Sequence, residues 1–275
     1  MAYTNINAGR PSSGLRYVED IIAFRHLCWN LVASDLRSRF RRSSVGILWA
    51  IIQPLTFALM IAAVWGTVMG MPNYFQFAVY VFSGLIVWDY IGTVVGISQD
   101  SLINAEGYLK QTRIPFLIFQ VRTPLSAAII FLCGLAGLIG LMLALGQVPP
   151  LGPHLLLLPV FAALLVLFGI PLAVIMSLMG TLYRDVKYIS QIAMQGLFFI
   201  SPVMLDHAVF ERPELQFLKY VNPAFAMLDL FRAPILHGEA WDLSSMLSVV
   251  AWILALWAIA GIMAVKVGRR IVFAL

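Results

Sequence analysis

The sequence predicts an all-α polytopic membrane protein with six transmembrane helices, an amphipathic interface helix before the first and a re-entrant helical hairpin before the last. Three observations carry this prediction. Of the 275 residues, 61% are hydrophobic and 11% are charged, whereas soluble domains are about 45–50% apolar and about 25% charged. The apolar residues gather in stretches close to the roughly 20 residues that cross a bilayer as a helix. The basic residues favour alternate connecting segments. A soluble enzyme and a disordered chain are excluded.

Residues 1–45 form the predicted cytoplasmic N-terminal segment. Within it, residues 17–42 carry apolar side chains at helical spacing. Trp29 and a basic C-terminal end suit a helix that lies in the membrane interface, where cations also complement the helix dipole. A helix packed on a partner subunit fits the same pattern. The arginines of this basic end are Arg37, Arg39, Arg41 and Arg42.

Six apolar stretches qualify as spans: 46–69, 77–98, 120–146, 155–181, 188–204 and 245–267. The fifth is the weakest, because it is short and contains Gln191 and Gln195. Their lengths indicate helices rather than the spans of about 9–11 alternating residues of a membrane barrel. Pro54 is expected to bend the first span, since proline removes a backbone donor.

The 18 basic residues orient the chain. Sorting them by alternate connecting segments places 15 on one side of the membrane and 3 on the other. Cytoplasmic segments carry the excess of lysine and arginine, so both termini are predicted to be cytoplasmic. Omitting the fifth span would put the basic C-terminal tail outside, which favours six spans. This loop pattern also explains the net charge of +5 without a nucleic-acid partner.

Two cytoplasmic connections attract attention. Residues 100–115 (DSLINAEGYLKQTRIP) are amphipathic, of mixed charge and ended by proline, which favours a short surface helix, with an ordinary solvated loop as the alternative. Arg184 and Asp185 stand at a tight inner turn, where they are expected to pair with each other or with neighbouring helices.

The long external segment contains an apolar stretch, residues 221–236, that is too short to cross the membrane and is bounded by Pro223 and Pro234. It predicts a hairpin that dips part-way into the outer leaflet, buried in protein or lining a cavity. A solvent-exposed loop is disfavoured, because it would expose a large apolar patch.

The sequence contains no phosphate-binding loop, zinc motif or nucleophile elbow. We therefore predict no catalytic residue, no metal and no cofactor on this chain. Asp89 is the one acid inside a predicted span, and it either lines a polar cavity or is satisfied by neighbouring polar groups. So few intramembrane acids argue against ion coupling, which points to an energy source on a separate partner.

Aromatic residues are candidates for a sugar conduit, because sugar rings stack on aromatic faces. Trp49, Phe57 and Trp65 recur every eight residues along the first span, and Phe198 and Phe199 lie in the fifth. Lipid-facing packing is the alternative for each of them.

Several motifs occur together in a specific order: RRSSVGILWAIIQP, SGLIVW, LKQTRIP, YRDV, SPV and NPAFAMLDLFRAPILHG. In this order they resemble the membrane subunit of bacterial polysaccharide ABC exporters, the type-2 permease superfamily, over about residues 16–270. The nearest branches of that family handle O-antigen, teichoic acid and capsule polymers. Asp89 departs from the family, which often carries asparagine after the tryptophan.

The resemblance implies that residues 46–275 form a six-span permease domain in the bacterial inner membrane. Two copies would form a channel, and two separate ATPase subunits would bind ATP and Mg²⁺. The cargo would be a polysaccharide, in the nearest case O-antigen on a polyprenyl pyrophosphate lipid. Alternatives are teichoic acid, a capsule polymer, or a small lipid or drug; more distant ones are a lipid-modifying membrane enzyme and an ion-coupled transporter.

The resemblance also assigns roles to residues. The coupling segment, residues 100–115, would seat in an ATPase groove through Ser101, Asn104, Glu106, Tyr108, Lys110 and Arg113. The gate segment, residues 202–244, would form the periplasmic gate with Pro202, Asn222, Pro223 and Arg232. The four arginines at the end of the interface helix would meet the pyrophosphate or anchor the chain at the membrane surface.

Overall fold

The structure, a computed structural model, describes residues 24–68, 70, 73–111, 114–205, 209–210 and 212–274, and for residues 267–274 it describes the backbone. The elements in these ranges are helical, in agreement with the predicted all-α class. Part of the predicted interface helix, residues 17–23, lies outside them. The elements are α2 (Arg25–Arg39), η1 (Gly46–Leu48), α3 (Trp49–Val68), α4 (Tyr74–Ser98), α5 (Glu106–Gln111), α6 (Phe116–Ala144), η2 (Pro153–Leu156), α7 (Leu157–Leu182), α8 (Val186–Phe199), α9 (Leu218–Val221), α10 (Pro223–Arg232), η4 (Ala233–His237) and α11 (Leu243–Ala274).

Among the described residues, five helical segments are long and apolar enough to cross a membrane. They are Gly46–Val68, Tyr74–Ser98, Phe116–Ala144, Pro153–Leu182 and Leu243–Lys266, and they match five of the six predicted spans. The remaining stretch forms α8, which has 14 residues. At a rise of 1.5 Å per residue it is about 21 Å long, shorter than a hydrocarbon core of about 30 Å. Length and composition therefore support five spans.

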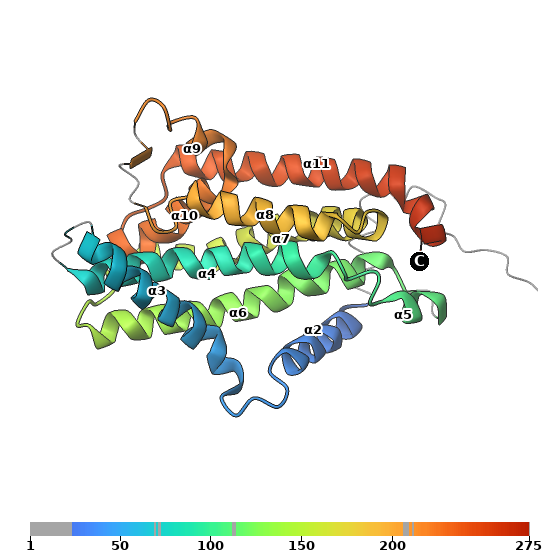
Figure 1. Cartoon of the computed structure of the whole chain (residues 1–275), viewed down its shortest axis with the longest axis horizontal. Coiled ribbons are helices and arrows are strands. Elements are labelled where there is room, and N and C mark those ends of the chain that lie inside the picture. Colours follow the sequence, from blue (N-terminus) through green and yellow to red (C-terminus); the bar gives the residue numbers. More distant parts are fainter. Residues whose placement is uncertain are drawn as a thin grey trace, which may run out of the picture.

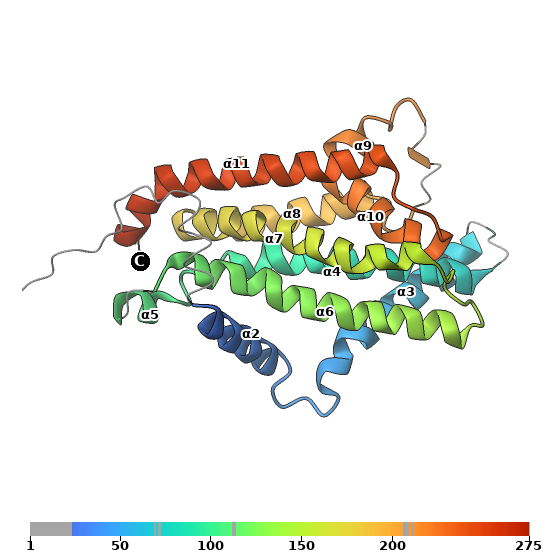
Figure 2. The same ribbon diagram turned by 180° about the vertical axis from the view of Figure 1, so that it is seen from behind.

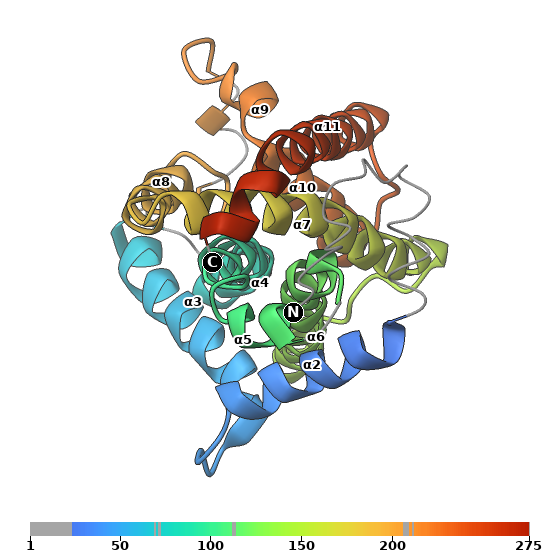
Figure 3. The same ribbon diagram turned by 90° about the vertical axis from the view of Figure 1, so that its right-hand side faces the viewer.

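Helix α4 is the centre of the bundle. Viewed from one end, it is surrounded by α3, α6, α7 and α8, all of which contact it (Figure 3). In its most apolar stretch 72% of the residues are buried, against 17–28% in the other spans. Asn73 caps the start of the helix. Its side chain accepts hydrogen bonds from the backbone N–H groups of Phe75 and Gln76 and so satisfies two donors that have no helical partner. The other helices pack around this scaffold.

The bundle has two distinct ends. Helix α5 and the last turns of α11 lie at one end, which we call the α5 end, and α9 and α10 lie at the other, the α10 end (Figures 1 and 2). Helix α8 runs from the α5 end to the α10 end, beside α4. The chain thus returns to the α10 end before α11 begins.

Helix α10 is buried in the α10 end. The ring centroid of Phe231 on this helix lies 5.5 Å from that of Phe131 on α6 and 5.2 Å from that of Phe161 on α7. Removing a buried phenylalanine of this kind costs about 3–5 kcal/mol. The predicted burial of this apolar stretch is confirmed for most of it, whereas Val221 is 61% exposed. The buried apolar residues are Phe225, Met227, Leu228, Leu230, Phe231 and Ile235.

Helix α2 lies outside the bundle against α6 (Figure 2). One side buries Cys28 and Val32, while Trp29 is 61% exposed. The helix therefore has a side that faces the bundle and an outer side, and its place in the membrane interface stays a prediction. After it, Arg42 has a φ of 66°, a left-handed conformation that is uncommon for a non-glycine residue, and this sharp turn leads into α3.

Candidate functional site

The α10 end holds a buried polar cluster around Arg232, which is 4% exposed. Its Nε donates a hydrogen bond to Ser83 Oγ at 3.0 Å, and Nη1 donates to the Pro202 carbonyl at 2.5 Å. Nη2 donates to the carbonyls of Val203 at 2.9 Å and Tyr80 at 3.1 Å. A guanidinium offers five donors in a fixed fork, so one side chain joins α4, α10 and the segment that follows α8.

The neighbours of Arg232 are shaped to fit it. The Tyr80 ring centroid lies 3.7 Å from the guanidinium carbon, within the range of a cation–π interaction. Gly84, on the same helix, leaves the space for it, because a Cβ there would lie 2.6 Å from Arg232 Nη2 and 2.7 Å from the Val203 carbonyl. Only glycine avoids this clash.

Asn222 starts α10 beside this cluster. Its Oδ1 accepts a hydrogen bond from the backbone N–H of Ala224, and its Nδ2 donates to Ser201 Oγ at 2.7 Å. Pro223 occupies the first helical position, where its missing N–H would have no helical partner. The predicted gate residues Pro202, Asn222, Pro223 and Arg232 thus lie in adjoining parts of the α10 end. Their action as a gate stays a prediction.

The coupling segment lies at the α5 end, and its helix is shorter than expected, since α5 covers Glu106–Gln111. Asn104, Tyr108 and Lys110 are exposed, and Lys110 forms an ion pair with Glu106. Ser101 is 1% exposed. It packs inside the chain, so it does not offer a surface for docking. Arg113 lies outside the described residues.

Two polar contacts tie the start of the coupling segment to α8. Lys187 Nζ lies 2.8 Å from Asp100 Oδ2, and Gln99 Nε2 donates to Ser190 Oγ at 2.6 Å. Gly180 of α7 lets the Gln99 backbone approach closely, because a Cβ there would be 2.5 Å from the Gln99 carbonyl. The ends of α4, α7 and α8 that lie at the α5 end are thus joined at one place.

Arg184 and Asp185 do not form the expected ion pair with each other. Both residues are exposed, and no ion pair between described residues includes either of them. The turn directs them outward, and the Asp185 carbonyl accepts hydrogen bonds from the N–H groups of Tyr188 and Ile189 at the start of α8. Lys187 takes the ionic role instead.

Helix α3 carries a groove on its outer face. It is lined by Trp49, Gln53, Thr56, Phe57 and Met60, which share one side of the helix. Trp49 and Phe57 are 46% and 49% exposed. Amide and hydroxyl groups therefore alternate with aromatic faces along a membrane-crossing surface.

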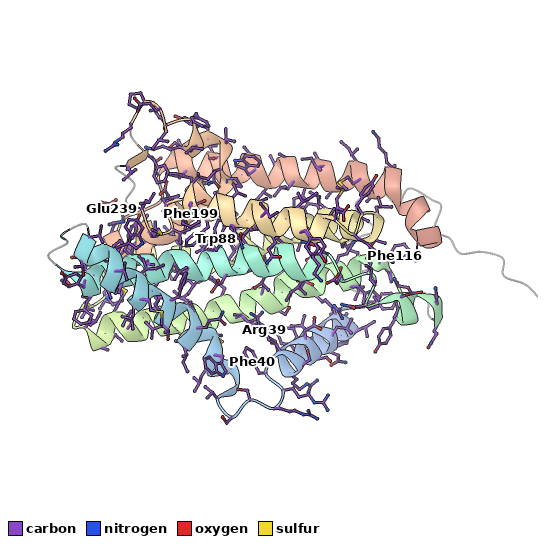
Figure 4. The ribbon with its side chains drawn as sticks, in the orientation of Figure 1. Arg39, Phe40, Trp88, Phe116, Phe199 and Glu239 are labelled. Atoms are coloured by element: carbon purple, nitrogen blue, oxygen red, sulfur yellow. The ribbon has the colours of Figure 1, made fainter. Side chains whose placement is uncertain are left out.

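The five predicted conduit aromatics do not form one site. Trp65 is 38% exposed but does not line the groove. On α8, Phe198 packs edge-on against Trp88 at 5.6 Å and against Phe199 at 5.6 Å, and Trp88 and Phe199 come from different helices (Figure 4). Trp88 was not predicted as a site residue. Its position next to the intramembrane acid Asp89 could have indicated it.

The end of α2 forms a positive surface. The exposed arginines there are Arg37, Arg39, Arg41 and Arg42. Sequence patterns did not indicate the ion pair that attaches this helix, between Arg122 Nε of α6 and Asp35 Oδ2 at 3.5 Å. Burial raises the pKa of the Asp35 carboxyl, and the attraction of Arg122 offsets this rise only in part.

Five helices among the described residues are long and apolar enough to cross a membrane, and they pack together into one bundle. This architecture is that of an α-helical polytopic membrane protein. The chain belongs to the ABC-2 type transporter family, whose model matches residues 26–236.

Its curated relatives include proteins named as O-antigen export permeases and a polysialic acid transport protein. The chain is 25% identical over 252 residues to the O-antigen export system permease protein RfbA of Myxococcus xanthus, covering 90% of this chain and 95% of that protein. It is 24% identical over 229 residues to RfbA of Klebsiella pneumoniae, covering 82% and 86%. It is 21% identical over 210 residues to the polysialic acid transport protein KpsM of Escherichia coli, covering 76% and 80%.

Proposed function

We propose that this chain is the channel-forming permease subunit of an ATP-driven exporter that moves a polysaccharide across the bacterial inner membrane. The observation that carries the proposal is the α3 groove, in which Trp49, Gln53 and Phe57 share a membrane-crossing face. Polar side chains inside a membrane normally face protein or a water-filled path. Aromatic faces beside amides suit sugar rings. The O-antigen export permeases among the relatives agree with this cargo.

The second element of the proposal is a homodimer with the conduit between its copies. Gln53 on α3 and Gln191 and Gln195 on α8 are exposed on the surface of one chain. An amide without a hydrogen-bond partner in hydrocarbon is costly. A second copy and a hydrated path between the two would give these groups partners, which supports an interface that includes α3 and α8.

Two separate ATPase subunits would bind at the α5 end. The surface there combines exposed Ile103 and Tyr108 with Lys110 and Asn104, a mixture of apolar and polar groups suited to a protein partner. ATP and Mg²⁺ would be bound by those subunits, because this sequence has no phosphate-binding loop. The contacts of Asp100 and Gln99 with α8 would carry their movement into the membrane domain.

We propose six crossings, with α8 as the fifth. Helix α7 ends at the α5 end and α11 starts at the α10 end, so the chain between them must travel the length of the bundle. Helix α8 covers that distance despite its 14 residues, and local thinning of the bilayer accommodates short spans. Both termini are then cytoplasmic, and α9, α10 and η4 form the re-entrant periplasmic hairpin.

The cargo would be a polymer on a polyprenyl pyrophosphate lipid, such as O-antigen. The arginines at the end of α2 are exposed, and guanidinium groups bind phosphate oxygens through paired, charge-assisted hydrogen bonds. Their anchoring role at the membrane surface is compatible with this one. The lipid-linked intermediate that accumulates in cells lacking this chain would distinguish O-antigen from teichoic acid, capsule polymer or a small lipid.

Co-purification tests the central claim. The tagged chain should recover a separate ATPase, and the purified chain alone should hydrolyse no ATP; intrinsic hydrolysis would refute the proposal. Lys110→Glu should reduce ATPase recovery. The double change Glu106→Lys with Lys110→Glu restores the local ion pair but not the surface charge pattern, so recovery should stay low. Full recovery in both variants would contradict the docking role of this surface.

A further inference from the structure

A small notch opens on the flank of the bundle where α3, α4 and α6 meet. Its lining includes Ala50 and Pro54 of α3, Asp89 and Thr93 of α4, and Ile130 of α6. Its volume of about 20 Å³ has room for one group the size of a water molecule or an ammonium. Asp89 is exposed at the surface of the chain, so the notch is accessible from outside. We call it the Asp89 notch.

The polar groups of the notch are mainly hydrogen-bond acceptors. Asp89 brings a carboxylate and Thr93 a hydroxyl, and neither side chain makes a hydrogen bond to another described residue. Pro54 has no N–H, so the carbonyl of Ala50, four residues earlier in the helix, loses its helical donor. Such a set requires a partner with several N–H or O–H donors, and the carboxylate favours a cation.

The notch lies beside the first turns of α3, at the start of a candidate span. Ala50 is the second residue of α3, and the turn before this helix carries Arg41 and Arg42, both exposed. Basic residues that flank a span meet the lipid headgroups, so we infer that the membrane surface on this flank is near the first turn of α3. Arg39 lies at the end of α2, where the chain turns toward α3 (Figure 4).

We propose that the Asp89 notch binds the headgroup of a membrane phospholipid that carries a primary ammonium next to a phosphate, as phosphatidylethanolamine does. The ammonium occupies the notch and donates its three hydrogen bonds to Asp89, Thr93 and the Ala50 carbonyl. The phosphate stays outside and accepts from Arg39. This arrangement neutralises both the acid in the notch and Arg39, and each bond is charge-assisted or replaces the helical donor that the Ala50 carbonyl lacks.

Native mass spectrometry of the purified full chain tests the proposal without any transport reaction, so its result is independent of the export function. Delipidated protein is mixed with equal amounts of phosphatidylethanolamine, phosphatidylcholine and phosphatidylglycerol of matched acyl chains. Phosphatidylcholine keeps the charge but has no N–H donor and a larger cation, and phosphatidylglycerol has the phosphate alone. We expect phosphatidylethanolamine adducts to exceed phosphatidylcholine adducts by about tenfold.

The variants locate the effect. Asp89→Asn, which keeps the side-chain size, should bring the two lipids to equal abundance, and Thr93→Val should lower the preference. Glu214→Gln, a matched change at an exposed acid far from the notch in sequence, should leave it unchanged. Equal binding of both lipids to the wild-type chain, or a full preference in Asp89→Asn, would overturn the proposal. Stabilisation of the wild type by sodium without a lipid preference would overturn it too, and would assign the notch to a monovalent cation.

Discussion

Arg232 and Ser83 are 149 residues apart in the sequence and are joined by a hydrogen bond of 3.0 Å from Nε to Oγ. The bond connects α10, at the α10 end of the bundle, to the central helix α4. Because the same guanidinium also reaches the carbonyls of Pro202 and Val203, the arrangement fixes three parts of the α10 end relative to each other.

Replacing Arg232 should destabilise the chain more than its charge alone explains. Arg232→Lys keeps the charge but loses the planar fork, so several of the four hydrogen bonds are left unmade at a buried site. We expect a loss of about 2–4 kcal/mol, seen as a lower apparent melting temperature in detergent. Arg212→Lys, at an exposed position between α8 and α9, is the matched control and should change stability by less than about 0.5 kcal/mol. Equal melting temperatures for both variants would contradict this reading.

Two glycines of α4 provide a test of close packing. An alanine methyl at Gly84 would meet Arg232 and the Val203 carbonyl, whereas nothing lies within 4 Å of the same position at Gly96. Gly84→Ala should therefore lower the melting temperature. Gly96→Ala should raise it slightly, because alanine favours a helix interior by about 1 kcal/mol over glycine. The opposite order in a thermal unfolding measurement would show that the space beside Arg232 is not needed.

The attachment of α2 should depend on pH through Asp35. Its pKa is raised in the folded chain by burial, so the folded state binds this proton more tightly than the unfolded state. The resulting stabilisation is complete below the ordinary value of about 3.9 and is lost as pH rises through the raised folded-state pKa. Asp35→Asn should remove this dependence in melting curves recorded across that range, while Glu214→Gln, an exposed acid, should retain it. Parallel curves for Asp35→Asn and wild type would contradict the assignment.

Cysteine accessibility should decide whether α8 crosses the membrane. In a chain with Cys28→Ser and Cys133→Ser, single replacements Asp185→Cys and Glu214→Cys flank α8. If it crosses, a membrane-impermeant maleimide should label position 214 in intact cells and position 185 only after permeabilisation. Lys110→Cys should behave like position 185. Labelling of positions 185 and 214 from the same side would leave five spans.

The aromatic faces of the α3 groove should assist export. Trp49→Ala and Phe57→Ala should each reduce surface polysaccharide by about threefold to tenfold, the range expected for one aromatic contact, at equal protein abundance on an immunoblot. Leu59→Ala changes an exposed residue of the same helix that does not line the groove and should have no effect. A similar loss in all three variants would indicate lipid packing instead of cargo contact.

The long apolar helices could be predicted because hydropathy and length report directly on a bilayer, and the burial of α10 followed from an apolar stretch too short to cross. Sequence patterns did not reveal what buries α10, since the partners of Arg232 and Phe231 come from distant segments. The pairing expected for Arg184 and Asp185 was wrong because adjacency in sequence does not fix side-chain direction at a turn. Ser101 was assigned to a docking surface from its place in a motif, while its burial depends on tertiary packing.

The contacts of Asp100 and Gln99 with the first turns of α8 have a mechanical consequence. No side chain of α8 is buried, and an element with few buried contacts is the first to yield when a structure is loaded. A displacement of residues 100–115 therefore acts on α8 directly, without repacking the dense interior around α4. If the proposed ATPase subunits displace residues 100–115, we expect this one helix to tilt or slide while the other helices of the bundle keep their arrangement.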